Sequence, residues 1–187
     1  MLNPRVASRY AKSLLDLAIE RGELEMIFAD MLYLQQLIKG SKEFLNLLKS
    51  PVVKPDVKTK AVNAVTEGKI SELTRSFTTL MIAKTRESVL PEVITSFIRQ
   101  YKAFKNIHTV KLTTATPISD QVKNNIVEKV KVEGNMHNIE LETIVNPDII
   151  GGFVLQTGDK LIDASISYDL KEISRQFENN DFIYKVR

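Results

Sequence analysis

The stretch NPDIIGGFVLQTGDKLIDASISYDL, residues 146–170, decides the fold of the second half of the chain. Two apolar runs, residues 149–155 and 161–166, flank the sequence Thr157-Gly158-Asp159-Lys160. Short apolar runs on either side of such a sequence are typical of two strands joined by a tight turn. We therefore predict a β-hairpin here, followed by a helix that begins near Ser167.

Gly151 and Gly152 stand inside the first of these predicted strands. Glycine weakens a strand, so a glycine there usually marks a bulge or a place where another segment of backbone approaches closely. We expect such a feature at this pair of glycines.

Asp163 and Ser165 point to one face of the second predicted strand and could suggest a nucleophile with a helper group. A serine nucleophile needs a base, however, and no histidine lies nearby in the sequence. Asp and Ser commonly bond backbone groups where a strand gives way to a helix, and we expect that role here. The structural signature of the hairpin then consists of Gly151, Gly152, Gly158, Asp159, Asp163 and Ser165.

Residues 1–105 carry the apolar spacing of helices, because apolar side chains recur at steps of three and four between glycines and prolines. Asn3 and Ser41 are expected to cap the first and third helices. The six predicted helices cover approximately residues 4–21, 24–40, 42–50, 55–66, 71–84 and 91–104. In the fourth helix the expected inner face consists of Val57, Ala61, Val62 and Val65.

The character of the sequence changes at Lys105-Asn106. Residues 109–114 and 139–145 show strand patterns, and a helix that begins at Ser119 separates them. The last helix is expected to turn Leu170, Ile173 and Phe177 inward. The predicted fold is therefore mainly α with a small α+β part: a six-helix bundle over residues 1–105 and an α+β domain with a β-hairpin over residues 106–187.

The composition argues against several classes of function. The chain has no cysteine, and its two histidines, His108 and His137, do not stand in a metal-binding spacing. The sequence contains neither a phosphate-binding loop nor a dinucleotide fingerprint, and no apolar run is long enough to span a membrane. We therefore expect no catalytic residue, no metal and no cofactor.

Charge is distributed unevenly along the chain. Residues 1–105 hold 17 basic and 11 acidic side chains, whereas residues 106–187 hold 9 and 12. Two domains with different partners would explain this difference, and so would chance scatter of solvated charge. The basic residues are spread over several helices without adjacent stacking aromatics, which favours solvated helix faces over a nucleic-acid surface.

Three motifs resemble the delta subunits of F-type ATP synthases, whose mitochondrial relative is the oligomycin-sensitivity-conferring protein. The first is residues 7–14, ASRYAKSL, which resembles the family's Ala-x-x-Tyr-Ala-x-Ala-Leu opening. The second combines residues 71–77, SELTRSF, with Arg86 and the following Leu90-Pro91, and the third is the opening hairpin block. The motifs occur in the family's order, so the resemblance covers nearly the whole chain.

Two departures from the family pattern stand out. The family often has Asp-Gly-Ser-Val-Arg where this chain has residues 163–167, DASIS, so a role of that arginine is in doubt here. Asn and Gly commonly precede the arginine that matches Arg86, whereas this chain has Lys84-Thr85. Neither departure removes an apolar core position.

The resemblance implies a non-catalytic subunit of the peripheral stalk, or stator. In that family the N-terminal domain binds N-terminal helices of alpha subunits, and the C-terminal part engages the b-type stalk subunits. The subunit links the catalytic hexamer to the membrane sector and thereby couples proton translocation to ATP synthesis. The resemblance also implies a peripheral location at the cytoplasmic face of the bacterial cell membrane, without direct insertion.

By the same resemblance the alpha-binding groove lies between the first and fifth helices. Recognition there would place the apolar side chains of a helix in a groove. Each candidate could equally be a core residue, because bundle helices need such stripes. The candidates are Ala7, Tyr10, Ala11, Leu14, Thr74, Phe77, Thr78 and Met81.

Two other classes of function are left open by the residues themselves. A free-standing helical nucleic-acid-binding protein would show basic charge clustered on the folded surface and steeply salt-dependent binding. A small hydrolase would require a polar cleft near Asp163 and Ser165.

Overall fold

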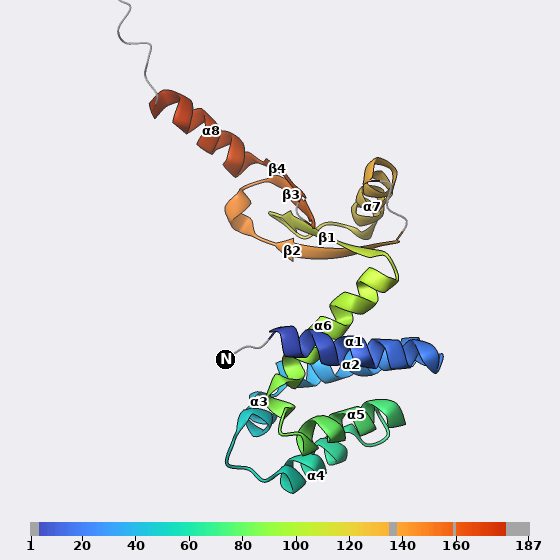
Figure 1. The fold of residues 1–187 in the computed structure, drawn as a ribbon. Coiled ribbons are helices and arrows are strands. Elements are labelled where there is room, and N and C mark those ends of the chain that lie inside the picture. The colour runs from blue at the N-terminus through green and yellow to red at the C-terminus, as the bar shows by residue number, and fades with distance from the viewer. Residues whose placement is uncertain (1–3, 135–137, 159, 179–187) are drawn as a thin grey trace, which may run out of the picture. The chain divides into compact units, whose positions relative to one another are not determined.

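The computed structural model describes residues 4–134, 138–158 and 160–178. The chain divides into two compact units, Met1–Lys105 and Asn106–Arg187 (Figure 1).

The first unit is helical. Its elements are α1 (Pro4–Glu20), α2 (Leu24–Gly40), α3 (Lys42–Lys49), α4 (Pro55–Thr66), α5 (Glu72–Ala83), the short 3-10 helix η1 (Glu87–Val89) and α6 (Leu90–Phe104). α6 packs across both α1 and α2 (Figure 1). Phe97 of α6, Leu14 of α1 and Ile27 of α2 are buried in this unit. The prediction of a mainly helical N-terminal part is confirmed.

Side chains cap two of these helices at their N-terminal ends. The backbone N–H of Phe44 donates to Oγ of Ser41 at 3.1 Å, which confirms the cap expected for α3. The backbone N–H of Thr74 donates to Oγ of Ser71 at 3.3 Å at the start of α5. Such bonds satisfy N–H groups that have no partner inside the helix. The cap expected at Asn3 lies outside the described residues.

The buried face of α4 differs from the expected one. Val62 is buried as expected, but Val57 and Val65 are exposed, and the other buried residues are Lys58 and Thr66. The helix is therefore rotated by about one residue, roughly 100°, from the apolar stripe. Both buried polar groups have partners: Lys58 forms an ion pair, and Oγ1 of Thr66 donates to the carbonyl of Val62 at 2.7 Å. These bonds offset the cost of burying polar groups.

The second unit contains a four-stranded mixed sheet. Its elements are β1 (Ile107–Thr114), α7 (Asp120–Gly134), β2 (Asn138–Val145), the 3-10 helix η2 (Pro147–Ile149), β3 (Gly152–Thr157), β4 (Lys160–Ser165) and α8 (Ile166–Glu178). The strand order is β2-β1-β3-β4, with β1 and β2 parallel and the other pairs antiparallel. A parallel pair needs a crossover connection, which α7 provides. The small α+β part is confirmed.

The predicted hairpin is present, with Thr157 opposite Lys160, although Asp159 lies outside the described residues. The first strand starts later than its apolar run suggests. The carboxamide oxygen of Asn146 accepts a hydrogen bond from the backbone N–H of Asp148 at 3.1 Å, and Pro147 begins η2. Residues 147–149 therefore form a helical turn instead of strand, and β3 begins at Gly152.

The sheet is buried mainly at its centre. Leu112 and Leu155 lie opposite each other on β1 and β3, and with Val110 they form a buried cluster that Ile126 and Val130 of α7 contact. Ile162 of β4 continues the same row but is 55% exposed. Apolar surface therefore remains uncovered toward the β4 edge of the sheet.

Candidate partner-binding surfaces

A groove lies between α1 and α5, and we call it the α1–α5 groove. Its volume is about 450 Å³. The groove is mostly apolar, and its lining residues are Tyr10, Ser13, Leu14, Leu17, Leu73, Ser76, Phe77 and Leu80. Leu80 is 50% exposed, so part of the apolar lining is accessible from outside the bundle. The groove is therefore an apolar surface of this unit.

The structure separates the eight groove candidates into two groups. Tyr10, Leu14 and Phe77 line the groove. The others are almost completely buried in the described structure: Ala7, Ala11, Thr74, Thr78 and Met81. A partner can therefore reach Tyr10 and Phe77 directly. Leu14 lines the groove but is only 2% exposed, and the second group supports the helices from within.

The buried alanines of α1 lie beside its groove-lining side chains and pack inside the bundle. α1 packs mainly against α6. Ala7, Ala11 and Ala18 are buried on α1 and are small enough to allow a close approach of two helices. Larger side chains of α1, such as Leu14 and Leu17, are left to line the groove.

Sequence reasoning missed several lining residues, namely Ser13, Leu17, Leu73, Ser76 and Leu80. A signal for the three leucines was available. Leu17 lies three residues after Leu14, Leu80 lies three residues after Phe77, and Leu73 lies four residues before Phe77, so each shares a helix face with a candidate. The two serines could not be separated from solvent positions by spacing alone.

A carboxylate from α2 holds the start of α5. Oδ2 of the buried Asp30 accepts hydrogen bonds from the backbone N–H of Ser71 at 2.9 Å and from its Oγ at 2.6 Å. It also accepts a bond from Oγ1 of Thr74 at 2.7 Å. A negative charge at a helix N-terminus is favourable because the backbone N–H groups there are partly positive. Asp30 thus fixes the α5 wall of the groove against α2.

A second hollow of about 370 Å³ continues the groove at one end. Its lining consists of Val6, Arg9, Tyr10, Ser13 and Arg86, so it shares Tyr10 and Ser13 with the α1–α5 groove. We call this part, defined by Arg9 and Arg86, the basic end. Within residues 4–134, 138–158 and 160–178, neither guanidinium forms an ion pair.

Arg86 follows a helix C-terminus of unusual composition. Thr85 adopts a positive φ of 53°. The backbone N–H of Arg86 donates to the carbonyl of Met81 at 2.8 Å, and that of Thr85 to the carbonyl of Ile82 at 2.9 Å. This is the Schellman arrangement, whose left-handed position usually holds glycine. The departure at Lys84-Thr85 therefore leaves the backbone turn intact, although a β-branched residue occupies a position that favours glycine.

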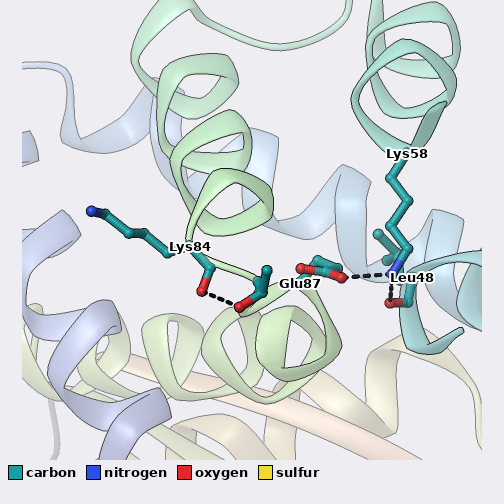
Figure 2. A network of polar contacts seen from close by, with 5 residues as sticks. Leu48, Lys58, Lys84 and Glu87 are labelled. Carbon is teal, nitrogen blue, oxygen red and sulfur yellow. Dashed lines mark hydrogen bonds and ion pairs between the residues drawn. The ribbon is translucent and has the colours of Figure 1, made fainter. Parts of the chain in front are cut away.

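A buried ion pair fixes the segment that follows Arg86. Figure 2 shows Lys58 of α4 reaching Glu87 and the carbonyl of Leu48, while the side chain of Lys84 points away from them. Nζ of Lys58 lies 2.6 Å from Oε1 of Glu87 and donates to the carbonyl oxygen of Leu48 at 3.1 Å. The Lys58 side chain is 2% exposed. The pair therefore ties α4 and the end of α3 to η1, next to the basic end.

The end of α6 is joined to α2 by Tyr101, whose ring stacks on Phe28 at 3.8 Å between centroids. The Tyr101 hydroxyl donates to Oε2 of Glu25 at 2.6 Å, and Nζ of Lys105 lies 2.7 Å from Oε1 of the same carboxylate. Burial and the neighbouring Glu25 carboxylate raise the pKa of Tyr101 to about 12. The hydrogen bonds from Lys105 and Tyr101 lower the pKa of Glu25.

In the second unit, α8 carries an exposed apolar stripe. Its members are spaced four, three and four residues apart and are 46% to 76% exposed: Ile166, Leu170, Ile173 and Phe177. The expectation that Leu170, Ile173 and Phe177 turn inward is therefore wrong. The reason is that α8 extends from the end of β4 and contacts β4 and η2 instead of covering the sheet (Figure 1). We call these four residues the C-terminal stripe.

The junction between β4 and α8 has the structural role expected of it. Oγ of Ser165 accepts a hydrogen bond from the backbone N–H of Tyr168 at 3.2 Å, and Oδ1 of Asp163 accepts one from the backbone N–H of Ser165 at 3.0 Å. Both side chains therefore bond backbone groups at the strand-to-helix junction. Among the residues that the structure describes, no three acidic or histidine side chains are grouped to hold a metal.

The glycine pair marks a close approach, as predicted. Gly152 has a φ of +75°, and a Cβ atom there would overlap the carbonyl oxygen of Ala164. A Cβ atom on Gly151 would lie 2.6 Å from Cδ1 of Ile166. Gly152 thus allows β3 to pack closely against β4, and Gly151 allows the start of α8 to approach the backbone before β3.

Comparison with known proteins gives consistent results. The ATP synthase delta (OSCP) subunit family matches residues 6–177. The ATP synthase subunit delta of Cytophaga hutchinsonii is 36% identical over 177 residues, covering 95% of this chain and 96% of the relative. The ATP synthase subunit delta of Christiangramia forsetii is 30% identical over 186 residues, covering 100% of this chain and 100% of the relative. A chain in the Toxoplasma gondii mitochondrial ATP synthase hexamer has a similar fold, with a TM-score of 0.68 and 23% identity, over 92% of this chain and 97% of that one.

Proposed function

The chain belongs to the ATP synthase delta (OSCP) subunit family, and we propose that the α1–α5 groove and the C-terminal stripe bind its two partners in the stalk. Members of this family are non-catalytic stator subunits that link the catalytic sector F1 to the stalk of an enzyme that couples proton transport to ATP synthesis. The proposal assigns an N-terminal helix of an alpha subunit to the groove and a b-type stalk helix to the stripe.

The shape of the α1–α5 groove supports a helical partner. From Tyr10 to Leu17 the wall extends over two turns of α1, which is about 10 Å at roughly 1.5 Å per residue. Apolar side chains from two helices line it, with Leu80 half exposed at its rim. An amphipathic helix binds such a groove by inserting side chains spaced three and four residues apart. The exposed apolar groove is the observation that carries the first assignment.

The first assignment is tested by titrating the full chain with a peptide of the alpha-subunit N-terminal helix from the same organism. We expect Leu80→Asp to weaken binding at least about tenfold, because a carboxylate would lose water against apolar side chains. Val57→Asp is the matched control, since Val57 is 52% exposed on α4 and does not line the groove. Unchanged affinity of a folded Leu80→Asp variant would refute the groove assignment.

The spacing of the C-terminal stripe supports the second assignment. Steps of four, three and four are the spacing of a and d positions in a coiled coil, where apolar side chains pack between helices. The two units of this chain would thus bind separate partners: residues 1–105 the alpha subunit and residues 106–187 the b-type subunits. All four residues of the stripe are at least 46% exposed. Without a partner, the stripe would leave a continuous apolar surface in contact with water, which is unfavourable.

The second assignment predicts loss of binding to a purified b-type stalk segment when Ile173 becomes Asp. Gln176→Asp introduces the same side chain on the same helix outside the stripe and serves as control. Helical content by circular dichroism separates a lost contact from a lost fold. Equal retention of both variants by the immobilised stalk segment would exclude the stripe as the contact.

The location of the protein follows from this second contact. None of the described helices is long and apolar enough to cross a membrane. We propose that the subunit is held at the cytoplasmic face of the bacterial cell membrane through the stalk. Membrane fractions of cells should contain the native chain together with other subunits of the complex, and they should lose the Ile173→Asp variant.

A further inference from the structure

The basic end of the α1–α5 groove has no role in the apolar contacts described above. We propose that it recognises a carboxylate side chain on the helix that the groove binds, and this inference rests on the proposed function of the groove. Arg9 and Arg86 come from separate elements, 77 positions apart in sequence, yet line one hollow. Tyr10 and Ser13 belong to both the hollow and the groove, so a single helix can occupy both.

Charge complementarity identifies the chemistry of the contact. Neither guanidinium has an ion-pair partner in the part of the chain that the structure describes. Two like charges that line one hollow repel each other, and a carboxylate between them would remove that repulsion. Arginine also presents several donors in a planar arrangement that matches a carboxylate. An Asp or Glu side chain of the bound helix fits this site.

The geometry also gives the position of that carboxylate in the partner. Arg9 and Leu17 are eight residues apart on α1, which corresponds to about 12 Å along the helix. A helix lying along α1 covers this distance in about eight residues. The acidic residue should therefore lie about two turns from the apolar residue that contacts Leu17. This spacing would fix the register in which the partner helix binds.

The structure holds Arg86 in place for such a contact. Its backbone N–H bonds the carbonyl of Met81, and the adjacent Glu87 is fixed by the buried pair with Lys58. The ordering cost of an arginine side chain is lower when its backbone is already fixed. The segment is thus built to present a cation beside the groove.

Titration of the full chain with the alpha-subunit N-terminal peptide tests the inference. We expect the double variant Arg9→Glu/Arg86→Glu to bind about tenfold or more weakly at 50 mM salt. The control Lys12→Glu/Lys84→Glu changes charge equally at exposed positions outside both hollows and should stay within about threefold of the native chain. Replacing one acidic residue of the peptide by its amide should weaken binding to the native chain about fivefold and leave binding to the arginine variant unchanged.

Three outcomes decide the matter. The inference is supported if replacing one peptide carboxylate weakens binding to the native chain but not to the arginine variant, and if this difference disappears at high salt. Peptide binding that responds to Leu80→Asp but not to the arginine variant overturns the inference and leaves the groove assignment standing. No binding by the native chain overturns both.

Discussion

The buried pair of Lys58 and Glu87 allows a quantitative test of how the first unit is held together. Lys58→Met keeps most of the side-chain volume but removes the ammonium group. The change breaks the 2.6 Å contact with Glu87 and the 3.1 Å bond to the carbonyl of Leu48. Oε2 of Glu87 is already buried without a partner in the described structure, so the variant would leave an uncompensated charge. Removing one partner of such a pair costs about 3–5 kcal/mol.

The double variant Lys58→Met/Glu87→Leu should be far less damaging than the single one. It removes both charges together, and replacing a buried ion pair by apolar residues is often neutral or stabilising. We expect the loss of the ion pair itself to change the free energy of unfolding by no more than about 1 kcal/mol. The carbonyl of Leu48 also loses its hydrogen-bond donor in this variant, which adds a separate cost.

Urea unfolding followed by circular dichroism at 222 nm measures these differences for the native chain, both single variants and the double variant. The double-mutant cycle then isolates the coupling between the two side chains. We expect a coupling of about 2 kcal/mol or more. A loss below about 1 kcal/mol for Lys58→Met would refute the argument that this pair is buried and strongly coupled.

Three further predictions concern backbone and pH. Thr85→Gly should raise the free energy of unfolding by about 1 kcal/mol, because glycine adopts the positive φ of 53° without strain. Thermal denaturation checks this prediction, and a lowered melting temperature would contradict it. Gly152→Ala should destabilise the second unit by more than about 1 kcal/mol, since the new Cβ would overlap the carbonyl of Ala164. Gly158→Ala should cost less, because Gly158 has a positive φ but open space around it. Hydrogen exchange of the β3 and β4 amides distinguishes the two variants. The hydrogen bond from Tyr101 should lose its stabilising effect between pH 10 and about 12, because the folded-state pKa is raised and the protonated hydroxyl is favoured below that range. Tyr101→Phe should therefore lose less stability than the native chain over this alkaline range, and equal losses in urea titrations would contradict the assignment.

The α1–α5 groove shows how far helix spacing can identify lining residues once the family resemblance has pointed to two helices. The three-residue and four-residue steps placed Tyr10, Leu14 and Phe77 on helix faces that do line the groove. The same spacing also selected Ala11 and Thr78, which are buried. Periodicity identifies an apolar face but cannot say whether that face meets its own bundle or a groove. That choice depends on where the neighbouring helices lie.

The fold was more accessible from sequence because its signals are local. Proline and serine at helix starts, glycine at turns and the hairpin residues act within a few positions of the backbone that they shape. The ends of α2, α3 and α5 and the close approach at Gly151 and Gly152 were therefore predictable.

Only the tertiary structure decided three features that matter for function. It rotated α4 so that a lysine became buried, it brought Arg9 and Arg86 to one hollow, and it left the C-terminal stripe exposed. Each depends on contacts between segments far apart in sequence, and a rotation of about 100° per residue separates adjacent helix faces. The amino-acid sequence by itself thus determined which segments form helices and strands, because those preferences act over short range. The packing of these segments determined which side chains remain available to a partner, because exposure is set by neighbours that local patterns do not specify.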